Sequence, residues 1–473
     1  MLTFFACIAL LIGGYFAYGR LVDTIFGPDP SRTTPAVALN DGVDYVEMSP
    51  VKIFLVQLLN IAGLGPIFGP ILGALYGPAA LLWIVIGCIF AGAVHDYFSG
   101  MLSLRNGGKS IPDVVGLELG NAFKQFMRVF SIVLLLLVGI VFVLGPAKLL
   151  GNMSGLAVPV WVGIIFAYYF LATILPIDKI IGRVYPLFGA VLIFMAVGLT
   201  VALIAKGYQF YPQLTLANLH PKELPLWPLM FITIACGAIS GFHATQSPLM
   251  ARCVKNEKDG RKLFYGAMIG EGIIALVWAT LGMSFYNGAE ALNAALGKGG
   301  PAFVVNEIST TLLGPVGGLL AIIGVIILPI SSGDTAFRSA RLIIADFMTV
   351  EQKSIVKRLY LAVPLFAIGF LVSLAEFGVI WRYFGWANQT LATIVLWTGA
   401  AYLIKQGKFH WIATAPATFM TAVVTTYLAY AKIGFSLPLQ ISTWIGIGVA
   451  LLALMLFLVK FRKAETIPDT VSA

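Results

Sequence analysis

Charged residues, cysteine and histidine are all scarce in this sequence. Charged residues make up 11% of its 473 residues, whereas soluble domains average about 25%. The four cysteines form no CxxC pair, so we expect them to act as small apolar residues. The motifs HExxH and GxSxG do not occur either, which argues against a membrane-embedded enzyme of the metalloprotease or serine hydrolase type.

Apolar residues are abundant instead, at 59% of the chain. Apolar runs of about 17 to 25 residues, the length that spans a bilayer as helix, recur throughout. The sequence therefore predicts an all-α polytopic membrane protein with one transporter domain, residues 1–473, and no separate soluble domain. We expect thirteen transmembrane helices, at residues 3–18, 52–76, 79–103, 127–149, 159–175, 186–206, 228–249, 263–286, 315–336, 359–379, 387–404, 411–431 and 440–460.

Positive charge is distributed unevenly between the loops that these helices define. Six of the 30 lysines and arginines fall on the side of the N-terminus and 24 on the other side. The positive-inside rule therefore predicts an outer N-terminus and a cytoplasmic C-terminus in a bacterial inner membrane. The first helix lacks a preceding basic residue and a cleavage site, so it is expected to be an anchor. The basic loops are expected to face lipid headgroups, with no role in binding nucleic acid.

The helix order indicates an internal repeat. Helices 2 to 6 (residues 52–206) begin on the cytoplasmic side, and helices 7 to 11 (residues 228–404) begin on the outer side. Two five-helix blocks of opposite topology are the plan of secondary transporters whose substrate sites lie between the repeats. Helix 1 (residues 1–18) and the two last helices (residues 411–460) are then additions to this core.

Both repeats contain helix breakers in their first helix. Helix 2 contains "IAGLGPIFGP" (residues 61–70) and helix 7 contains "CGAISGFHATQSP" (residues 236–248). Broken backbone in a membrane lines a cavity or is buried in protein, although close helix packing also requires small residues. We expect a substrate site at the two breaks, formed by Gln57, Asn60, Gly63, Gly65, Pro66, Gly69, Ser240, Gly241, His243, Gln246 and Ser247. His243 could equally satisfy backbone groups that the break leaves free.

Three longer motifs make the sequence familiar. They are "GPIFGPILGALYGPAALLWIVIGCIFAGAVHDYFSGMLSLRNGGKSIPDV", "LPIDKIIGRVYPLFG" and "SGFHATQSPLMARC", which begin at Gly65, Leu175 and Ser240. Together they closely resemble the carbon starvation protein (CstA) family of bacterial inner-membrane transporters, and the resemblance runs from about residue 1 to about residue 400. It implies uptake of small peptides or pyruvate, coupled to protons, by a LeuT-like fold of the amino acid/polyamine/organocation (APC) type.

Ionisable residues inside the membrane are costly, and each is a candidate for ion coupling. His95 and Asp96 lie late in helix 3, and Glu271 lies at a similar depth in helix 8. Asp96 with His95 is the first candidate for carrying the coupling proton, and Glu271 is the second. Alternatively, Asp96 caps a helix break or pairs with a basic residue. Neighbouring residues on a helix point about 100° apart, so His95 and Asp96 need not touch.

Helix 9 supplies a second set of candidates. Its segment "LPISSGDTAFRSARL" contains Ser331, Ser332, Asp334 and Thr335. The resemblance to LeuT-like carriers implies a sodium ion held by such hydroxyls and by carbonyls of the first broken helix. The hydroxyls could instead bond to their own helix, and Asp334 could form an interfacial ion pair with Arg338.

Further polar segments are expected outside the substrate site. Asp178, Lys179 and Arg183 follow helix 5 and predict a salt-bridged loop or gate. Asn388 and Gln389 open helix 11, where they would line an entrance or cap the helix. A metal site formed by His95, Asp96 and His243 has no supporting spacing, so no cofactor is expected beyond H⁺ or Na⁺.

The sequence leaves the transported substrate open. The start of the second half of helix 2, near Ile67, would offer free N–H groups to a carboxylate. A peptide also requires an acceptor for its ammonium group, whereas pyruvate does not. The main hypothesis is alternating access by a proton-coupled carrier, and a sodium-coupled carrier of another carboxylate or amino acid is the alternative. A channel is disfavoured because the sequence contains no pore filter.

Overall fold

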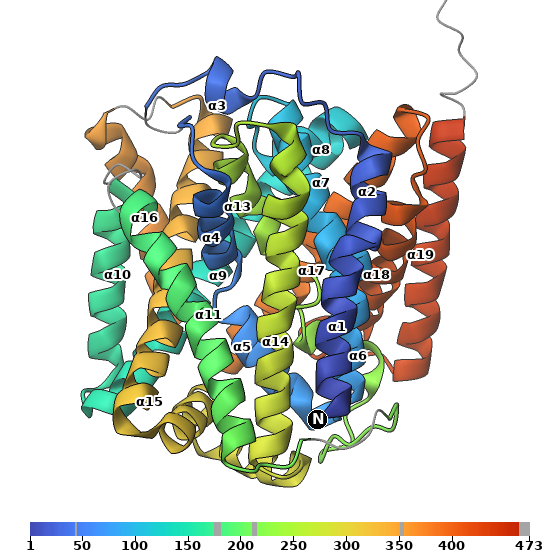
Figure 1. Ribbon diagram of the computed structural model, residues 1–473. Coiled ribbons are helices and arrows are strands. Elements are labelled where there is room, and N and C mark those ends of the chain that lie inside the picture. Colours follow the sequence, from blue (N-terminus) through green and yellow to red (C-terminus); the bar gives the residue numbers. More distant parts are fainter. Residues whose placement is uncertain (43–44, 175–180, 211–214, 351–353, 463–473) are drawn as a thin grey trace, which may run out of the picture.

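The structure, a computed structural model, describes residues 1–42, 45–174, 181–210, 215–350 and 354–462. These residues form a bundle of helices that run roughly parallel to one axis (Figure 1). The α-helices are α1 Leu2–Phe16, α2 Tyr18–Phe26, α3 Pro35–Ala38, α4 Pro50–Ile61, α5 Gly65–Gly73, α6 Ala79–Gly87, α7 Ala93–Arg105, α8 Ile111–Leu119, α9 Asn121–Ser154, α10 Val158–Ile174, α11 Ile181–Ala205, α12 Phe231–Thr233, α13 Gly241–Ala251, α14 Gly266–Phe285, α15 Ala289–Met348, α16 Ile355–Ser373, α17 Phe377–Lys405, α18 Trp411–Tyr430 and α19 Leu439–Arg462.

Each of the thirteen expected segments corresponds to a helix or to a broken pair of helices. Within the described residues, eight helices are long and apolar enough to cross a membrane, and the bent pair of α4 and α5 makes nine. The remaining four expected spans correspond to α10, α11, the interrupted segment of α12 and α13, and α17. The protein is therefore an all-helical, multi-pass membrane protein, as its composition predicts.

Several helices extend beyond their predicted bounds, including α9, which was predicted at 127–149, and α17, which was predicted at 387–404. The first predicted helix is interrupted at Ala17 and continues as α2 to Phe26, because Val22 and Phe26 still face the core despite polar neighbours. The predicted helix at 315–336 is the last part of α15, which is interrupted by non-helical residues at Gly299, Gly300 and Gly314 and then continues from Pro315 to Met348. Its charged residues Asp334, Arg338 and Arg341 are buried inside the bundle, so hydropathy alone underestimates the length of the helix.

The two predicted breaks are present. Helix α4 ends at Ile61, α5 begins at Gly65, and their axes differ by 50°. Helix α12 ends at Thr233 and α13 begins at Gly241. The chain passes down from α4 to α5 in Figure 1. In the second broken helix, α12 contacts α5 and the following α13 contacts α4, so the two broken helices run in opposite directions.

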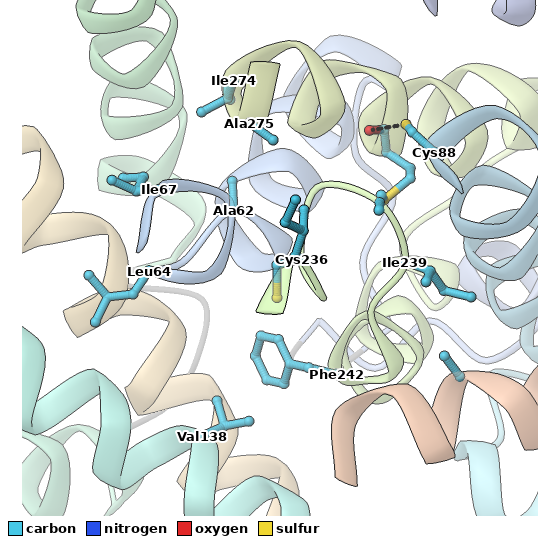
Figure 2. Close-up of a cluster of buried hydrophobic side chains, with 14 of the residues drawn as sticks. Ala62, Leu64, Ile67, Cys88, Val138, Cys236, Ile239, Phe242, Ile274 and Ala275 are labelled. Carbon is cyan, nitrogen blue, oxygen red and sulfur yellow. Dashed lines mark hydrogen bonds between the residues drawn. The ribbon is translucent and has the colours of Figure 1, made fainter. Parts of the chain in front are cut away.

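Close packing between the breaks accounts for their glycines. A Cβ atom on Gly65 would lie 2.2 Å from the Cys236 side chain, and one on Gly69 would lie 3.0 Å from the Thr233 carbonyl oxygen. A Cβ on Gly63 would lie 2.4 Å from the Phe142 ring. Figure 2 shows side chains of both breaks in one hydrophobic cluster, including Leu64, Cys236 and Phe242. The glycines at the breaks are therefore required by close packing, and the helix is also broken there.

Gly237 is constrained twice, by its backbone and by its neighbour. Its φ is +89°, and a Cβ there would lie 2.3 Å from the Ala275 Cβ. We expect Gly237→Ala to destabilise the fold by about 1–3 kcal/mol, because a strained backbone and an overpacked contact are added together. The measurement is thermal unfolding of the detergent-solubilised protein. Gly163→Ala in α10, where nothing lies within 4 Å, is the control; equal stability of both variants would contradict this account.

Candidate functional site

Asp96 lies between two histidines in the centre of the bundle. Its Oδ1 is 2.7 Å from Nδ1 of His95, and its Oδ2 is 2.9 Å from Nδ1 of His243. All three side chains are fully buried. The side chains of His95 and Asp96 turn toward each other although the residues are neighbours on α7. The predicted pairing of Asp96 with a histidine is therefore present, with a second histidine from α13.

Glu271 lies on the other side of the same imidazole ring. Nε2 of His243 is 3.2 Å from Oε2 of Glu271, and Glu271 is fully buried on α14. Within the described residues, His243 Nε2 and both Glu271 oxygens lack a well-aligned hydrogen bond. His243 thus bridges a carboxylate of the first block and a carboxylate of the second. We call Asp96, His243, Glu271 and His95 the central relay.

The two broken helices also carry buried side-chain oxygen atoms that have no hydrogen-bond partner among the described residues. Two of them lie on α4, and one lies on α13 near His243. Oε1 of Gln57, Oδ1 of Asn60 and Oε1 of Gln246 are buried and form no hydrogen bond within the described part of the chain. Ser247 on α13 links this helix to α4 and α7, because its hydroxyl accepts hydrogen bonds from Gln57 Nε2 at 3.4 Å and from Ser99 Oγ at 3.0 Å. Unpaired buried polar atoms are costly, so the site is suited to a polar ligand.

His243 follows the second break and does not lie within it. The non-helical segment ends at Ser240, and His243, Gln246 and Ser247 lie on α13. The expectation that His243 belongs to unwound backbone is therefore wrong. Helix α13 begins at Gly241. A Cβ at this position would lie 2.2 Å from the Asn388 carbonyl oxygen, so only glycine permits this approach to α17.

The start of α5 offers fewer donors than expected. The N–H groups of Ile67 and Phe68 donate to the Leu64 carbonyl oxygen at 3.2 and 2.8 Å. Helix α5 begins at Gly65, with Pro66, which has no N–H group, in its first turn. The expectation of free N–H groups near Ile67 is therefore wrong, because the turn at Leu64 already uses them. The assignment of Gly63, Gly65 and Gly69 to the substrate site remains a prediction.

Asn388 and Gln389 on α17 bind the backbone of the second break. Asn388 Oδ1 accepts from the Phe242 N–H at 2.6 Å and from the Ser240 hydroxyl at 3.2 Å. Gln389 Nε2 donates to the Phe231 carbonyl oxygen at 2.5 Å. Both residues are fully buried in the middle of α17, so the prediction that they open a helix is wrong. The signal that could have assigned them is an adjacent amide pair inside an apolar helix.

The hydroxyls of α15 contact the first break and their own helix. Ser332 Oγ donates to the Leu59 carbonyl oxygen at 3.2 Å. Ser331 and Thr335 donate to carbonyls of α15 itself, at 2.8 and 2.9 Å. Asp334 and Arg338 are 3.8 Å apart, but both are buried, so an interfacial pair is the wrong description. None of these contacts reaches the central relay.

Cys236 lies close enough to the central relay to form a metal site. Cys236, His243 and Glu271 each offer one ligand atom, and these atoms lie within 4.8 Å of one another. Asp96 behind His243 resembles the carboxylate that orients a metal-bound histidine. The description of Cys236 as only a small apolar residue is therefore incomplete. The same groups can also hold and pass a proton.

One end of the bundle contains an ion-pair network around a buried carboxylate, which the sequence did not reveal. Glu257 is fully buried and contacts Arg105 at 3.0 Å and Arg32 at 3.4 Å. It also accepts the Asp29 N–H at 2.8 Å, and Arg105 donates to the Tyr402 hydroxyl at 2.5 Å. We call this set the Glu257 network. Asp178 and Lys179, expected to form a gate, lie outside the described residues, as does the Arg183 side chain.

The structure contains two oppositely directed broken helices that meet at buried titratable groups. This arrangement is typical of one class of membrane protein. Secondary transporters place substrate and coupling ions between such repeats. Polar groups at this depth are otherwise too costly to retain. The fold and the site therefore define a secondary active transporter.

The family follows from comparison with known sequences. A family model described as "Carbon starvation protein CstA" matches residues 1–157, 146–312 and 283–428. The protein belongs to this family, as the three motifs predicted.

Curated relatives include both characterised and uncharacterised proteins. An uncharacterised membrane protein of Haemophilus influenzae is 51% identical, with 63% of this chain and 95% of the relative covered. The peptide transporter CstA of Escherichia coli is 25% identical, over 91% of this chain and 82% of the relative. The pyruvate/proton symporter BtsT of the same organism is 29% identical, over 53% of this chain and 44% of the relative.

Solved structures of two carriers share the fold. MhsT in complex with L-phenylalanine has a TM-score of 0.56 at 15% identity and covers 87% of this chain and 98% of that chain. Mhp1, a nucleobase-cation-symport-1 family transporter, has a TM-score of 0.57 at 16% identity, with 89% and 94% covered. These similarities confirm the LeuT/APC-like fold.

Asn388 provides a test of how the second break is held. We expect Asn388→Ala to destabilise the protein by about 1–3 kcal/mol, because the buried Phe242 N–H loses its acceptor. Asn388→Asp keeps an acceptor oxygen for the Phe242 N–H and should retain more of the stability. The measurement is thermal unfolding, with Gln406→Ala at the exposed end of α17 as the control. If Asn388→Ala and Gln406→Ala unfold at the same temperature, the capping role is wrong.

Proposed function

We propose that the protein imports small peptides or pyruvate across the inner membrane, coupled to protons, without altering the bonds of the substrate. The observation that carries this proposal is His243, whose two ring nitrogens face Asp96 and Glu271. The names of two relatives, a peptide transporter and a pyruvate/proton symporter, support the substrate class. The excess of lysine and arginine on one side supports an outer N-terminus.

The central relay can move a proton between the two repeats. An imidazole can accept a proton on one nitrogen and release one from the other. Here one nitrogen faces α7 and the other faces α14, and the ring itself is carried by α13. A shift of α13 against either neighbour would lengthen one contact and keep the other. Proton occupancy would therefore determine which arrangement of the broken helices is favoured.

The conformation fits one stage of alternating access. The Glu257 network lies at the end of the bundle that the charge distribution assigns to the cytoplasm. The opposite end has a cavity of about 670 Å³ beside α5 and α12. The central relay lies between these two ends and is fully buried. In the proposed orientation the cavity approaches the second break from the outside, while the central relay itself is closed off from both sides.

The substrate would bind where unpaired polar atoms border the central relay. Gln57, Asn60 and Gln246 offer side-chain oxygens without partners in the described structure. These oxygens are acceptors for the ammonium group or amide N–H groups of a peptide. Glu271 can serve the same purpose while it is ionised. Binding of a cationic group there would move a proton from Glu271 to His243, which lies 3.2 Å away, so that proton and substrate would be carried together.

Sodium coupling of a carrier for another small carboxylate or amino acid is the second candidate. The observation in its favour is the contact of Ser332 with the Leu59 carbonyl oxygen. A hydroxyl and a helix-end carbonyl are oxygen ligands of the kind that a hard cation prefers. In this conformation, however, the hydroxyl is used as a donor to that carbonyl. We therefore favour the proton.

The proton proposal makes a prediction for Asp96 and Glu271. We expect Asp96→Asn and Glu271→Gln to abolish uptake of substrate driven by an imposed proton gradient in proteoliposomes. Exchange of labelled for unlabelled substrate across the membrane should persist, because exchange requires no net proton movement. Glu290→Gln, at the exposed start of α15, is the control and should retain both activities. Undiminished proton-driven uptake by Asp96→Asn would falsify its assignment to the central relay.

The identity of the coupling ion can be separated from metal binding. We expect a proton gradient to accelerate uptake of pyruvate or trialanine, and a sodium gradient alone to have no effect. Ser332→Ala should then alter stability more than coupling. A chelator of transition metals should leave uptake unchanged, because the central relay would hold a proton in place of a metal. Acceleration by sodium that Ser332→Ala removes would establish the second candidate, and loss of uptake after chelation would establish a metal at Cys236, His243 and Glu271.

A further inference from the structure

A cavity at the end of the bundle where α5 ends is not part of the central relay. Its volume is about 670 Å³, and it lies between α5, α12, the start of α17 and the end of α18. Thr233 borders the cavity and is the last residue of α12 before the second break. The cavity therefore lies on a route from one face of the membrane to the break that precedes His243.

The charged side chains that line this cavity are all positive. Arg382 and Lys432 line it and are exposed, and within the described residues neither forms an ion pair. The described lining contains no aspartate or glutamate. His220 also lines it, but burial and nearby Lys222 lower the pKa of His220, so its imidazole is neutral at pH 7. A cavity with two uncompensated cations attracts anions.

The walls of the cavity indicate an organic anion. Tyr76, Trp381, Tyr427 and Tyr430 contribute aromatic surface, which binds the apolar parts of a solute and can also face an ammonium group. Pockets of about 300 to 1,000 Å³ enclose ligands considerably larger than a three-carbon acid. Pyruvate would leave most of the volume to water, whereas a peptide of two or three residues would contact both the cations and the aromatic walls.

We propose that this cavity is a capture site for short peptides, which bind through their C-terminal carboxylate to Arg382 and Lys432 before they reach the second break. This assignment rests on the proposed function and narrows its substrate class to peptides. The site differs from the substrate site at the breaks, because Arg382 and Lys432 lie on the outer end of α17 and beyond the end of α18. Capture here raises the local concentration of peptide and leaves the proton chemistry to the central relay.

The first measurement is binding, which does not require transport. Trialanine is added to the full-length protein in nanodiscs, and tryptophan fluorescence is recorded for the wild type and for Trp381→Phe. We expect a saturable change in the wild type that Trp381→Phe removes. Trialanine with an amidated C-terminus should bind about 5- to 20-fold more weakly, because two partly exposed charge pairs are lost. Equal binding of the acid and the amide would overturn the assignment.

The second measurement is uptake by variants of the two cations. The double variant Arg382→Gln with Lys432→Gln should raise the KM for trialanine about 5- to 20-fold at an unchanged maximal rate. Arg382→Lys should keep most of the affinity because the charge remains. Lys298→Gln, an exposed cation outside the cavity lining, is the matched control and should keep the wild-type KM. An unchanged KM in the double variant, or the same increase in Lys298→Gln, would overturn the capture site.

These outcomes distinguish the capture site from the proposed function. If the wild type binds trialanine at Trp381 but transports neither peptide nor pyruvate, the capture site holds and the function fails. If proton-driven uptake occurs but does not depend on Arg382 and Lys432, the function holds and the capture site fails. If pyruvate depends on the two cations as strongly as trialanine does, the cavity takes any carboxylate and the assignment to peptides is wrong.

Discussion

The contact of His243 with Asp96 and Glu271 is the interaction on which the rest of the site depends. It brings a side chain of α7 and a side chain of α14 within 3.2 Å of one ring on α13. Buried carboxylates are costly unless they are paired, and here the two share the His243 imidazole, while Asp96 also pairs with His95. Any motion of α13 therefore changes the surroundings of two carboxylates at once, one in each repeat.

The broken helices make this contact possible, and the rest of the bundle supports them. Glycines at both breaks let α5 and the segment after α12 pack closely. The freed backbone groups are bound from outside, by Asn388 and Gln389 on α17 and by Ser332 on α15. This is how irregular backbone is tolerated at membrane depth. The same arrangement keeps the breaks close enough together for His243 to reach both carboxylates.

Much of the fold could be predicted from the sequence, because membrane helices and their breaks depend on short stretches of neighbouring residues. Apolar runs predicted all thirteen segments, and Gly63 to Pro70 and Gly237 to Pro248 predicted the breaks. The similar depth of Asp96 and Glu271 was predicted from their positions in helices 3 and 8. Their shared partner was not, since nothing in the spacing of His95, Asp96 and His243 specifies which ring lies between the carboxylates. Long-range contacts of this kind depend on how the helices pack.

The errors have related physical causes. Asn388 was expected at a helix start because polar residues there usually cap the same helix, whereas it caps a different helix, 146 residues away along the chain, at Phe242. Nothing in the sequence distinguishes Glu257, because only the folded bundle brings Arg105 and Arg32 to it. The length of α15 was underestimated because its charged residues are satisfied inside protein and not in lipid. Hydropathy measures the preference for lipid, so it fails where a helix is surrounded by other helices.

The most direct test of the central relay is infrared difference spectroscopy of the protein in lipid as substrate binds. If Glu271 exchanges its proton when substrate arrives, a carboxylic acid band changes in the wild type, and that change disappears in Glu271→Gln. The account predicts this result for a peptide substrate under conditions in which it is transported. A spectrum in which no carboxyl band responds to substrate, or one in which the same band responds in Glu271→Gln, would contradict the claim that the central relay couples proton and substrate.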